Sequence, residues 1–206
     1  MRFTELDAVT LDAYGTLIEL ADPVPELDRG LRARGAEHDP ETIAHAFAAE
    51  VAYYREHAHE GSDAGSLAAL RLECVRVFLG ALPSELDPQE FVDTFIGSIR
   101  FEPLPGTLAA VRALRRRGLA LAVVSNWDIG LGEQLAKGGL GELPAVSSAE
   151  AGAPKPAPAV FLLAAERLGV RPERTLHVGD SVVDEQGALA AGFRFAPAPL
   201  DSVVAA

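Results

Sequence analysis

The pattern of apolar residues changes from one part of the chain to the next, and this change restricts the fold more than any other feature. Residues 8–11, Ala-Val-Thr-Leu, are typical of a short buried strand that leads directly into Asp12. From about residue 23 to 99, apolar residues recur at helical spacing. After Pro105 the pattern alternates between helix and strand. An isolated strand, a helical stretch and then alternation indicate that helices are inserted between one strand and the rest of its sheet.

The helical stretch is predicted to be a bundle. Asp39-Pro40 and Asp87-Pro88 each offer an aspartate N-cap followed by proline in the first helical position. Three sets of apolar-face residues follow i, i+3/i+4, i+7 spacing: Ile43, Ala46, Phe47, Glu50, Val51, Tyr54; Leu67, Leu70, Cys74, Val77, Phe78; and Phe91, Phe95, Ile99.

The alternating part predicts a parallel sheet with helices on both faces, which makes the chain an α/β protein. Helices are expected near residues 107–117, 131–137 and 157–168, and strands near 120–124, 145–147 and 175–178. The tail from Ala196 is expected to be a surface strand or a loosely held end. The predicted division is a sheet-containing core of residues 1–17 and 100–206, with 18–99 as the helical insertion.

Composition and charge exclude several classes of protein. At 206 residues and 49% hydrophobic content, the chain is long and apolar enough to bury a core. Its net charge of −12 disfavours nucleic acid as a partner, and Arg115–Arg117 are expected to complement a helix C-terminus. We expect a cytoplasmic protein without membrane contact, because no apolar signal core or spanning segment is present and Cys74 is the single cysteine.

Two polar clusters follow the first two predicted strands of the sheet. Asp12 stands at the end of the first strand, where a carboxylate can be a nucleophile, a metal ligand or simply a cap, and Gly15 and Thr16 follow it. Ser125 and Asn126 end the strand 120–124, where they can hydrogen-bond a developing oxyanion or form a turn. Both clusters are expected at the carboxyl edge of the sheet, where ligands of such folds bind.

Two more clusters lie further along the chain. Lys155 stands between two prolines, which stiffen its loop and suit charge neutralisation, although a solvated loop cation has the same pattern. Gly179-Asp180-Ser181 follow the strand 175–178, with Asp184 close behind. Asp12 and Asp180 together suit Mg²⁺, which favours one or two carboxylates, and the same residues around Ser181 also form a good helix N-cap.

In this order and spacing, the four clusters resemble the four motifs of the haloacid dehalogenase-like hydrolase superfamily. The match consists of Asp12-Ala13-Tyr14-Gly15-Thr16-Leu17, Ser125-Asn126, Lys155-Pro156 and Gly179-Asp180-Ser181-Val182-Val183-Asp184. The resemblance implies a Rossmann-like core with the helical insertion as a C1-type cap. It also implies that Asp12 attacks phosphorus or carbon to form an acyl-type intermediate, which water then cleaves.

The resemblance further implies roles for the other motif residues. Ser125 and Lys155 would steady the transferred group, and Asp184 would orient Lys155 or a metal-bound water. Mg²⁺ would be bound by Asp12, Asp180 and the carbonyl of Tyr14. Thr16 and Asn126 belong to the same motifs and complete the predicted catalytic set.

Tyr14 departs from the phosphatase pattern of this superfamily, which usually has a second aspartate there as general acid and base. Tyrosine at this place resembles the 2-haloacid dehalogenases. Against that reading, Phe47-Ala48 and Phe161 stand where those enzymes carry an arginine after an aromatic residue and a tyrosine, and Asp180 makes the fourth motif acidic. The acidic fourth motif, with Val124-Ser125-Asn126-Trp127-Asp128, is more similar to a phosphatase-like branch that lacks the second aspartate.

Residues of the insertion can then supply the missing proton transfer, and each is equally well explained as part of a solvated helix face. The candidates are Glu19, His45, Glu50 and His57, while Tyr53 and Tyr54 are expected either to line the cavity or to pack in the core.

Three functions follow from these motifs. The first is a Mg²⁺-dependent phosphatase for a small phosphorylated metabolite, working as a monomer or homodimer. The second is a metal-independent 2-haloacid dehalogenase, and the third is a non-enzymatic binding or scaffold protein.

Overall fold

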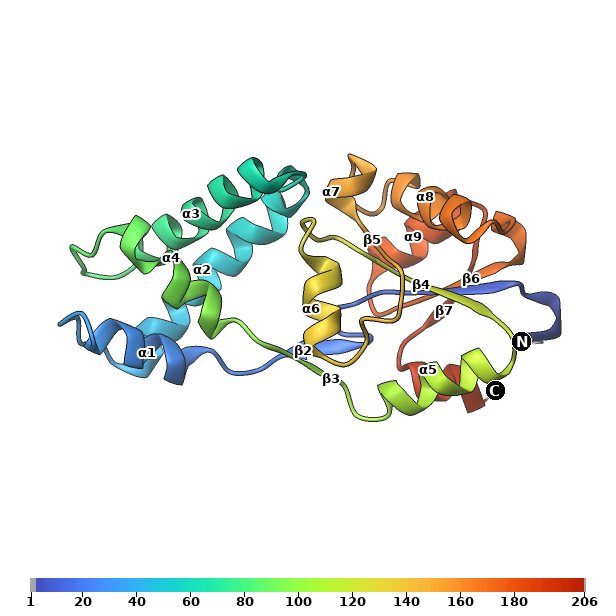
Figure 1. Cartoon of the computed structure of the whole chain (residues 1–206), viewed down its shortest axis with the longest axis horizontal. Coiled ribbons are helices and arrows are strands. Elements are labelled where there is room, and N and C mark those ends of the chain that lie inside the picture. The colour runs from blue at the N-terminus through green and yellow to red at the C-terminus, as the bar shows by residue number, and fades with distance from the viewer. Residues whose placement is uncertain (1–2, 206) are drawn as a thin grey trace. The chain divides into compact units, whose positions relative to one another are not determined.

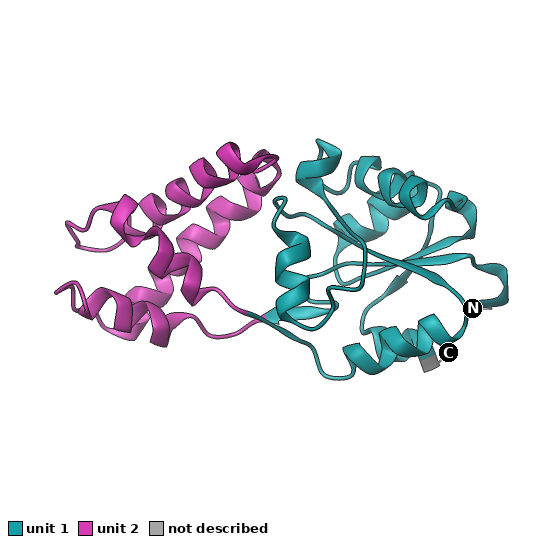
Figure 2. Ribbon diagram, viewed as in Figure 1, with its two compact units in different colours: residues 1–19, 101–206 teal, residues 20–100 magenta. Residues whose placement is uncertain are grey.

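The computed structural model describes residues 3–205, and the chain divides into two compact units. One unit contains the residues up to Glu19 and those from Phe101 onward, and the other contains Leu20–Arg100 (Figure 2). The first unit contains a five-stranded sheet and its helices. The second unit consists mainly of the four helices α1–α4.

The five-stranded sheet is parallel and has the order β5-β4-β1-β6-β7 (Figure 1). Its first strand is therefore central, with strands from the C-terminal half on both sides. This arrangement confirms the predicted α/β fold. The strands are β1 (Ala8–Leu11), β4 (Ala120–Ser125), β5 (Ala145–Ser147), β6 (Thr175–Gly179) and β7 (Arg194–Pro197).

Helices cover both faces of this sheet. Side chains of a strand alternate between the two faces, and β1 is buried along its whole length, so both faces carry apolar side chains that need covering. Val9 and Leu11 of β1 pack in one apolar cluster with α5, α6 and α10. The cluster on the other face contains residues of α8 and α9, including Phe161. The helices are α5 (Thr107–Arg116), α6 (Leu131–Lys137), α7 (Ser148–Ala151), α8 (Ala159–Leu168), α9 (Val182–Ala190) and α10 (Leu200–Ala205), with short 3-10 turns at Phe3–Glu5 and Pro172–Arg174.

The tail and a small ribbon differ from the sequence prediction. β7 is an edge strand, as one reading of the tail predicted, but α10 follows it. The reading as a loose end is wrong because Leu200, Val203 and Val204 pack against the core at i, i+3, i+4 spacing. A two-stranded ribbon, β2 (Ile18–Leu20) with β3 (Phe101–Pro103), was also missed, because three residues are too few to display alternation.

The helical unit contains α1 (Val24–Arg32), α2 (Pro40–His57), α3 (Ala64–Gly80) and α4 (Pro88–Ser98), with a 3-10 turn at Ala58–Glu60. Both predicted N-caps are confirmed. Asp39 accepts a hydrogen bond from the backbone of Thr42 at 2.8 Å, and Asp87 accepts one from Gln89 at 2.8 Å. Phe78, Phe91 and Phe95 are fully buried at the centre of this unit.

One carboxyl group is buried in this helical unit. Glu50 of α2 is 4% exposed. Burial raises its pKa from the ordinary 4.5 to about 7, although a hydrogen bond from the Cys74 thiol opposes the shift. Because the folded pKa exceeds the unfolded pKa, the folded state is favoured by protonation and loses stability as the pH rises from about 4.5 to above 7.

We therefore expect Glu50→Gln to stabilise the protein at about pH 8 by up to roughly 3 kcal/mol, and to change stability little near pH 4.5. Urea unfolding followed by circular dichroism at several pH values measures the difference. Glu56→Gln, on an exposed position of the same helix, is the matched control and should show no such trend. Equal stabilisation by Glu50→Gln at both pH values would contradict the assigned cause.

Candidate active site

Three neighbouring strands of the parallel sheet end in polar side chains that meet. Asp12 directly follows β1, Ser125 ends β4, and Asp180 directly follows β6. Since β1 lies between β4 and β6, their carboxyl ends are adjacent. The Ser125 hydroxyl donates to Asp12 Oδ1 at 3.0 Å, and the backbone N–H of Asp12 donates to the carbonyl of Val178 at 2.9 Å. Ser125 thus holds the Asp12 carboxylate while β6 holds its backbone, and the residue is 4% exposed.

The chain turns sharply after Asp12. The carbonyl of Ala13 accepts hydrogen bonds from the backbone of Leu17 at 2.8 Å and of Ile18 at 2.9 Å. Gly15 makes the turn possible with φ of +82°, in the left-handed region that favours glycine. Thr16 follows, and its buried Oγ1 has no hydrogen-bond partner within residues 3–205. This hydroxyl is available to a ligand.

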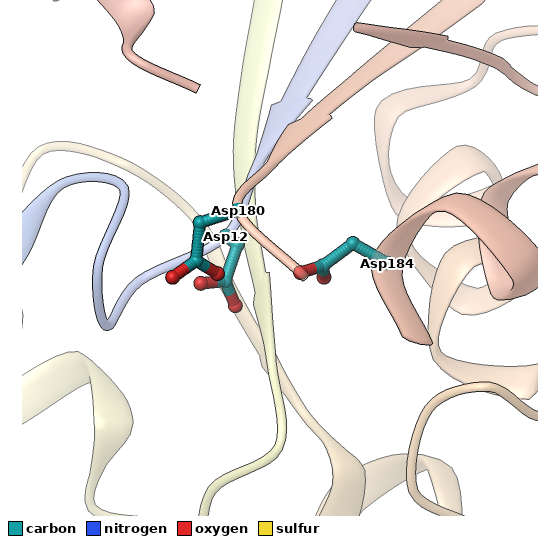
Figure 3. A group of neighbouring side chains, drawn as sticks. All are labelled: Asp12, Asp180 and Asp184. Carbon is teal, nitrogen blue, oxygen red and sulfur yellow. The ribbon is translucent and has the colours of Figure 1, made fainter. Parts of the chain in front are cut away.

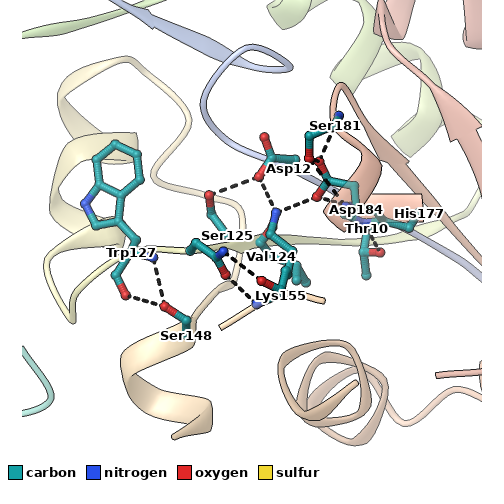
Figure 4. A network of polar contacts seen from close by, with 11 residues as sticks. Thr10, Asp12, Val124, Ser125, Trp127, Ser148, Lys155, His177, Ser181 and Asp184 are labelled. Carbon is teal, nitrogen blue, oxygen red and sulfur yellow. Dashed lines mark hydrogen bonds and ion pairs between the residues drawn. The ribbon is translucent and has the colours of Figure 1, made fainter. Parts of the chain in front are cut away.

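Lys155 lies between two carboxylates (Figure 4). Its ammonium donates to Asp12 Oδ1 at 2.6 Å, to Asp184 Oδ1 at 2.6 Å and to the carbonyl of Val124 at 3.2 Å. Burial alone would lower the pKa of Lys155, but the two carboxylates outweigh burial and raise it. Although burial opposes the change, hydrogen bonds and the Lys155 charge hold the pKa of Asp184 below its ordinary value. Lys155 and Asp184 therefore remain charged near neutral pH.

Asp180 completes a cluster of three carboxylates (Figure 3). Each of Asp12, Asp180 and Asp184 places a carboxylate oxygen within 4.8 Å of the others, and Asp180 is the exposed member. Partial burial, together with the charges of Asp12 and Asp184, raises the pKa of Asp180. Lys155 offers one positive charge to three negative ones. The cluster retains an excess of negative charge that suits a cation.

The side chain of Asn126 contacts the backbone of Lys155. The side-chain Oδ1 of Asn126 accepts a hydrogen bond from the Lys155 backbone N–H at 2.7 Å, and its Nδ2 donates to the Lys155 carbonyl at 3.2 Å. The amide therefore fixes the loop that carries Lys155.

An open pocket of about 450 Å³ adjoins Asp180, the exposed member of the carboxylate cluster. It is lined by Gly15, Thr16 and Asp180 together with residues of the segments 104–107 and 198–201, all in the sheet-containing unit. The pocket gives a small molecule access to Asp180 and to the turn after Asp12.

Comparison with known proteins identifies the family. The model of the family described as haloacid dehalogenase-like hydrolase matches residues 6–192, which include all four motifs. The chain belongs to the haloacid dehalogenase-like hydrolase family. Its resemblance to that superfamily, predicted from the motifs, is confirmed, and the protein is a hydrolase.

Individual relatives of this hydrolase bear different names. Mouse haloacid dehalogenase-like hydrolase domain-containing protein 3 is 33% identical over 97% of this chain and 86% of its own length. Glyceraldehyde 3-phosphate phosphatase of Methanopyrus kandleri is 38% identical, over 44% of this chain and 41% of its own length. The solved structure of L-2-haloacid dehalogenase from Xanthobacter autotrophicus with chloropropionic acid covalently bound has 30% identity and a TM-score of 0.68, covering 93% of this chain and 77% of that chain.

The structure brings most of the predicted site residues of this haloacid dehalogenase-like hydrolase together. Asp12, Ser125, Lys155 and Asp184 form one connected network, and Asp180 lies beside it. Tyr14 is 43% exposed, and its ring meets that of Phe101 edge-on, with ring centres 6.5 Å apart.

The proton-transfer candidates have differing surroundings. Glu19 and His45 are exposed, Glu50 is buried, and His57 stacks on Tyr53. Tyr54 is partly buried against the core of the helical unit. None of the helices in the described range is long and apolar enough to cross a membrane.

Sequence reasoning missed Thr10 and His177, which lie beneath the network. Thr10 Oγ1 is 2.9 Å from His177 Nδ1, and His177 Nε2 is 3.2 Å from Asp184 Oδ1. The available signal was weak: each is a polar residue within an apolar strand, two or three residues before a motif aspartate.

Gly15→Ala is expected to damage this site selectively. A Cβ at Gly15 would lie 2.1 Å from Asp180 Oδ2, so the carboxylate must move. The positive φ adds a cost of about 1–2 kcal/mol to stability. We expect hydrolase activity to fall by more than about tenfold.

Gly118→Ala is the matched control, because Gly118 has φ of +77° in the same unit and nothing lies within 4 Å of its added Cβ. Urea unfolding and activity assays of both variants separate strain from the clash. Equal activity loss in the two variants would contradict the role of the Asp180 contact.

Proposed function

We propose that this hydrolase cleaves a small phosphate ester, with Asp12 as the covalent nucleophile and Mg²⁺ as the metal ion. The observation that carries the proposal is the charge of the site: three carboxylates within 4.8 Å of one another meet one buried ammonium. A divalent cation would balance this excess, so that the carboxylates no longer repel the negative phosphoryl group from Lys155.

The residues present fit Mg²⁺. Asp12 and Asp180 would hold it with the backbone carbonyl of Tyr14, since hard cations of this kind favour a few oxygen ligands and keep several waters. The pocket beside Asp180 leaves space for such waters. Bound there, Mg²⁺ would supply charge neutralisation for the phosphoryl oxygens.

The nucleophile is held in a defined orientation by its neighbours. Asp12 Oδ1 accepts hydrogen bonds from Ser125 and Lys155, whereas Oδ2 has no such bond within the described part of the chain. We therefore assign Oδ2 as the attacking atom. It forms a bond to phosphorus while the bond from phosphorus to the leaving oxygen breaks. Water then attacks the phosphorus of this acyl phosphate, which releases inorganic phosphate and restores the Asp12 carboxylate.

Charged and polar groups around the nucleophile would stabilise the transferred group. Lys155 and Ser125 lie beside the reacting carboxylate, where their donors can also reach phosphoryl oxygens. The unpartnered hydroxyl of Thr16 can donate to a ligand in the pocket. Asn126 acts through the Lys155 loop, since both ends of its amide are hydrogen-bonded to the Lys155 backbone.

The division of labour between the two units is part of the proposal. Residues 1–17 and 100–206 would carry the chemistry, and residues 18–99 would act as the cap that selects the substrate. The residue at position 14 also affects which substrates should react fastest. Tyr14 offers no carboxylic acid to protonate the leaving alcohol. We therefore expect faster cleavage when the leaving oxygen is acidic, as in aryl or acyl phosphates.

The experiment is a phosphate-release assay of the purified protein across alkyl, aryl and acyl phosphates, with Mg²⁺ and with EDTA. Mg²⁺-dependent turnover of at least one class is the expected result. No turnover of any phosphate with Mg²⁺ would overturn the proposal.

A 2-haloacid dehalogenase is the second candidate, and two observations favour it. Tyr14 replaces the second aspartate, and the structural relative with covalently bound chloropropionic acid is 30% identical. In that case chloroacetate or bromoacetate should release halide at the same rate with and without EDTA. Family membership supports an enzyme over the non-enzymatic alternative.

A further inference from the structure

We propose that His177 is a positioning residue, which acts through Asp184 to hold the Lys155 ammonium against the Asp12 carboxylate. The proposal rests on the proposed function of this site, because it assigns the reacting atoms to Asp12. His177 lies on β6 directly opposite Thr10 of β1 in the register of the two strands.

A continuous line of hydrogen bonds joins these residues (Figure 4). Thr10 Oγ1 lies 2.9 Å from His177 Nδ1, and His177 Nε2 lies 3.2 Å from Asp184 Oδ1. Asp184 Oδ1 also accepts from Lys155, which donates to Asp12. Thr10 and His177 are completely buried, and Asp184 is 1% exposed. Water therefore cannot replace a member of the line without rearrangement.

The partners fix the direction of each hydrogen bond. Asp184 is ionised and accepts only, so His177 Nε2 must carry a hydrogen and donate to it. Burial lowers the pKa of His177, which keeps the ring neutral and leaves Nδ1 as an acceptor. Thr10 then donates its hydroxyl hydrogen to Nδ1. The threonine thus selects the tautomer that donates to Asp184.

The imidazole ring cannot readily turn away from this arrangement. Phe161 of α8 meets it edge-on with ring centres 4.9 Å apart, and Phe195 of β7 lies 6.4 Å away. The second oxygen of Asp184 accepts from the backbone and hydroxyl of Ser181 at the start of α9. His177 and Ser181 therefore hold Asp184 from two directions. These contacts fix the position of Asp184 Oδ1, which accepts the hydrogen bond from the Lys155 ammonium.

His177 does not contact Asp12, and its effect on the reaction passes through Asp184 and Lys155. Loss of its N–H removes one of the two donors at Asp184 Oδ1. We expect Asp184 to reorient and Lys155 to follow it. The nucleophile then loses a fixed partner at Oδ1, while substrate binding is affected less.

The first test is kinetic and uses the full-length protein. His177→Phe should lower kcat roughly ten- to a hundredfold, the typical effect of losing an outer hydrogen-bond partner, and change KM by less than about threefold. His177→Gln, which can place an amide N–H near the position of Nε2, should restore most of kcat. A kcat for His177→Phe within about twofold of the wild-type value would overturn the proposal.

The second test does not depend on activity, so it separates this proposal from the proposed function. Lys137 and Lys155 are the two lysines of the chain, and Lys137 is exposed. A ¹H–¹⁵N spectrum of the lysine ammonium groups should resolve Lys155 and show its signal shifted or lost in His177→Phe, with Lys137 unchanged. An unchanged Lys155 signal overturns the proposal, whether or not the wild-type protein hydrolyses phosphate esters.

Thr10→Val changes the side-chain volume little, so it tests the proposal if His177→Phe does not fold. It should alter the ¹⁵N signals of the His177 ring from the Nε2-protonated pattern and shift the Lys155 signal. Thr175→Val is the matched control, since Thr175 is equally buried on β6 but donates to the carbonyl of Arg171. The proposal is contradicted if Thr10→Val leaves both signals unchanged, or if Thr175→Val moves them equally.

Discussion

Asp12→Asn is expected to abolish hydrolysis while leaving the fold intact. Asparagine has the same shape and keeps a carbonyl oxygen for Ser125 and Lys155, whose contacts hold the wild-type carboxylate. It lacks the charged oxygen that we assign as the attacking atom. We expect kcat to fall by more than about 10³-fold, the scale seen when a covalent nucleophile is removed.

Circular dichroism and urea unfolding establish that the Asp12→Asn variant is folded. Asp93→Asn, an exposed position on α4, is the control for the same chemical change and should retain full activity. If Asp12→Asn kept more than about a tenth of the wild-type rate, Asp12 would not be the nucleophile.

Lys155→Met is expected to lower both stability and activity. Methionine is similar in length but carries no charge, so Asp12 and Asp184 would face each other without the ammonium that lies 2.6 Å from each. Removing one partner of a buried ion pair costs about 3–5 kcal/mol, because the remaining charge stays buried. Two carboxylates share this lysine, which places the expected loss in the upper part of that range.

The measurement is urea unfolding in EDTA, together with kcat at saturating substrate. The activity of Lys155→Met should fall by more than about 10²-fold, since the reacting group loses its nearest positive charge. Lys137→Met is the matched control. Lys137 pairs with Glu133 on the surface at 2.9 Å, and exposed pairs of this kind contribute about 1 kcal/mol or less. Equal destabilisation by the two substitutions would contradict the description of Lys155 as a buried centre of charge.

The position of the site could be predicted from the sequence because all strands of a parallel sheet run in the same direction. Asp12, Ser125 and Asp180 each stand at the end of an apolar strand, and the carboxyl ends of parallel strands share one edge. The order and spacing of the motifs then identified Lys155 and Asp184 as members of the same site. Their contacts within the site could not be read from the sequence.

Other features depend on packing across the sheet. His177 is one polar residue in an apolar strand, and its importance depends on Thr10, which is 167 positions away in the chain. Asn126 was predicted from its motif, but its pairing with the Lys155 backbone depends on how two loops meet. The ribbon of β2 and β3 was missed because its strands have three residues each. Long-range contacts of this kind leave no periodic signal in the sequence.

A trapping experiment tests the central claim, that Asp12 attacks phosphorus, most directly. The enzyme is mixed with an excess of the phosphate ester that the assay identifies, the reaction is stopped with borohydride, and residue 12 is analysed by mass spectrometry. Borohydride reduces an acyl phosphate to the alcohol but leaves a free carboxylate unchanged, so we expect homoserine at position 12 of the wild-type protein and none in Asp12→Asn. Residue 12 recovered only as aspartate during turnover would contradict attack by Asp12 and would mean that water attacks the phosphate ester directly.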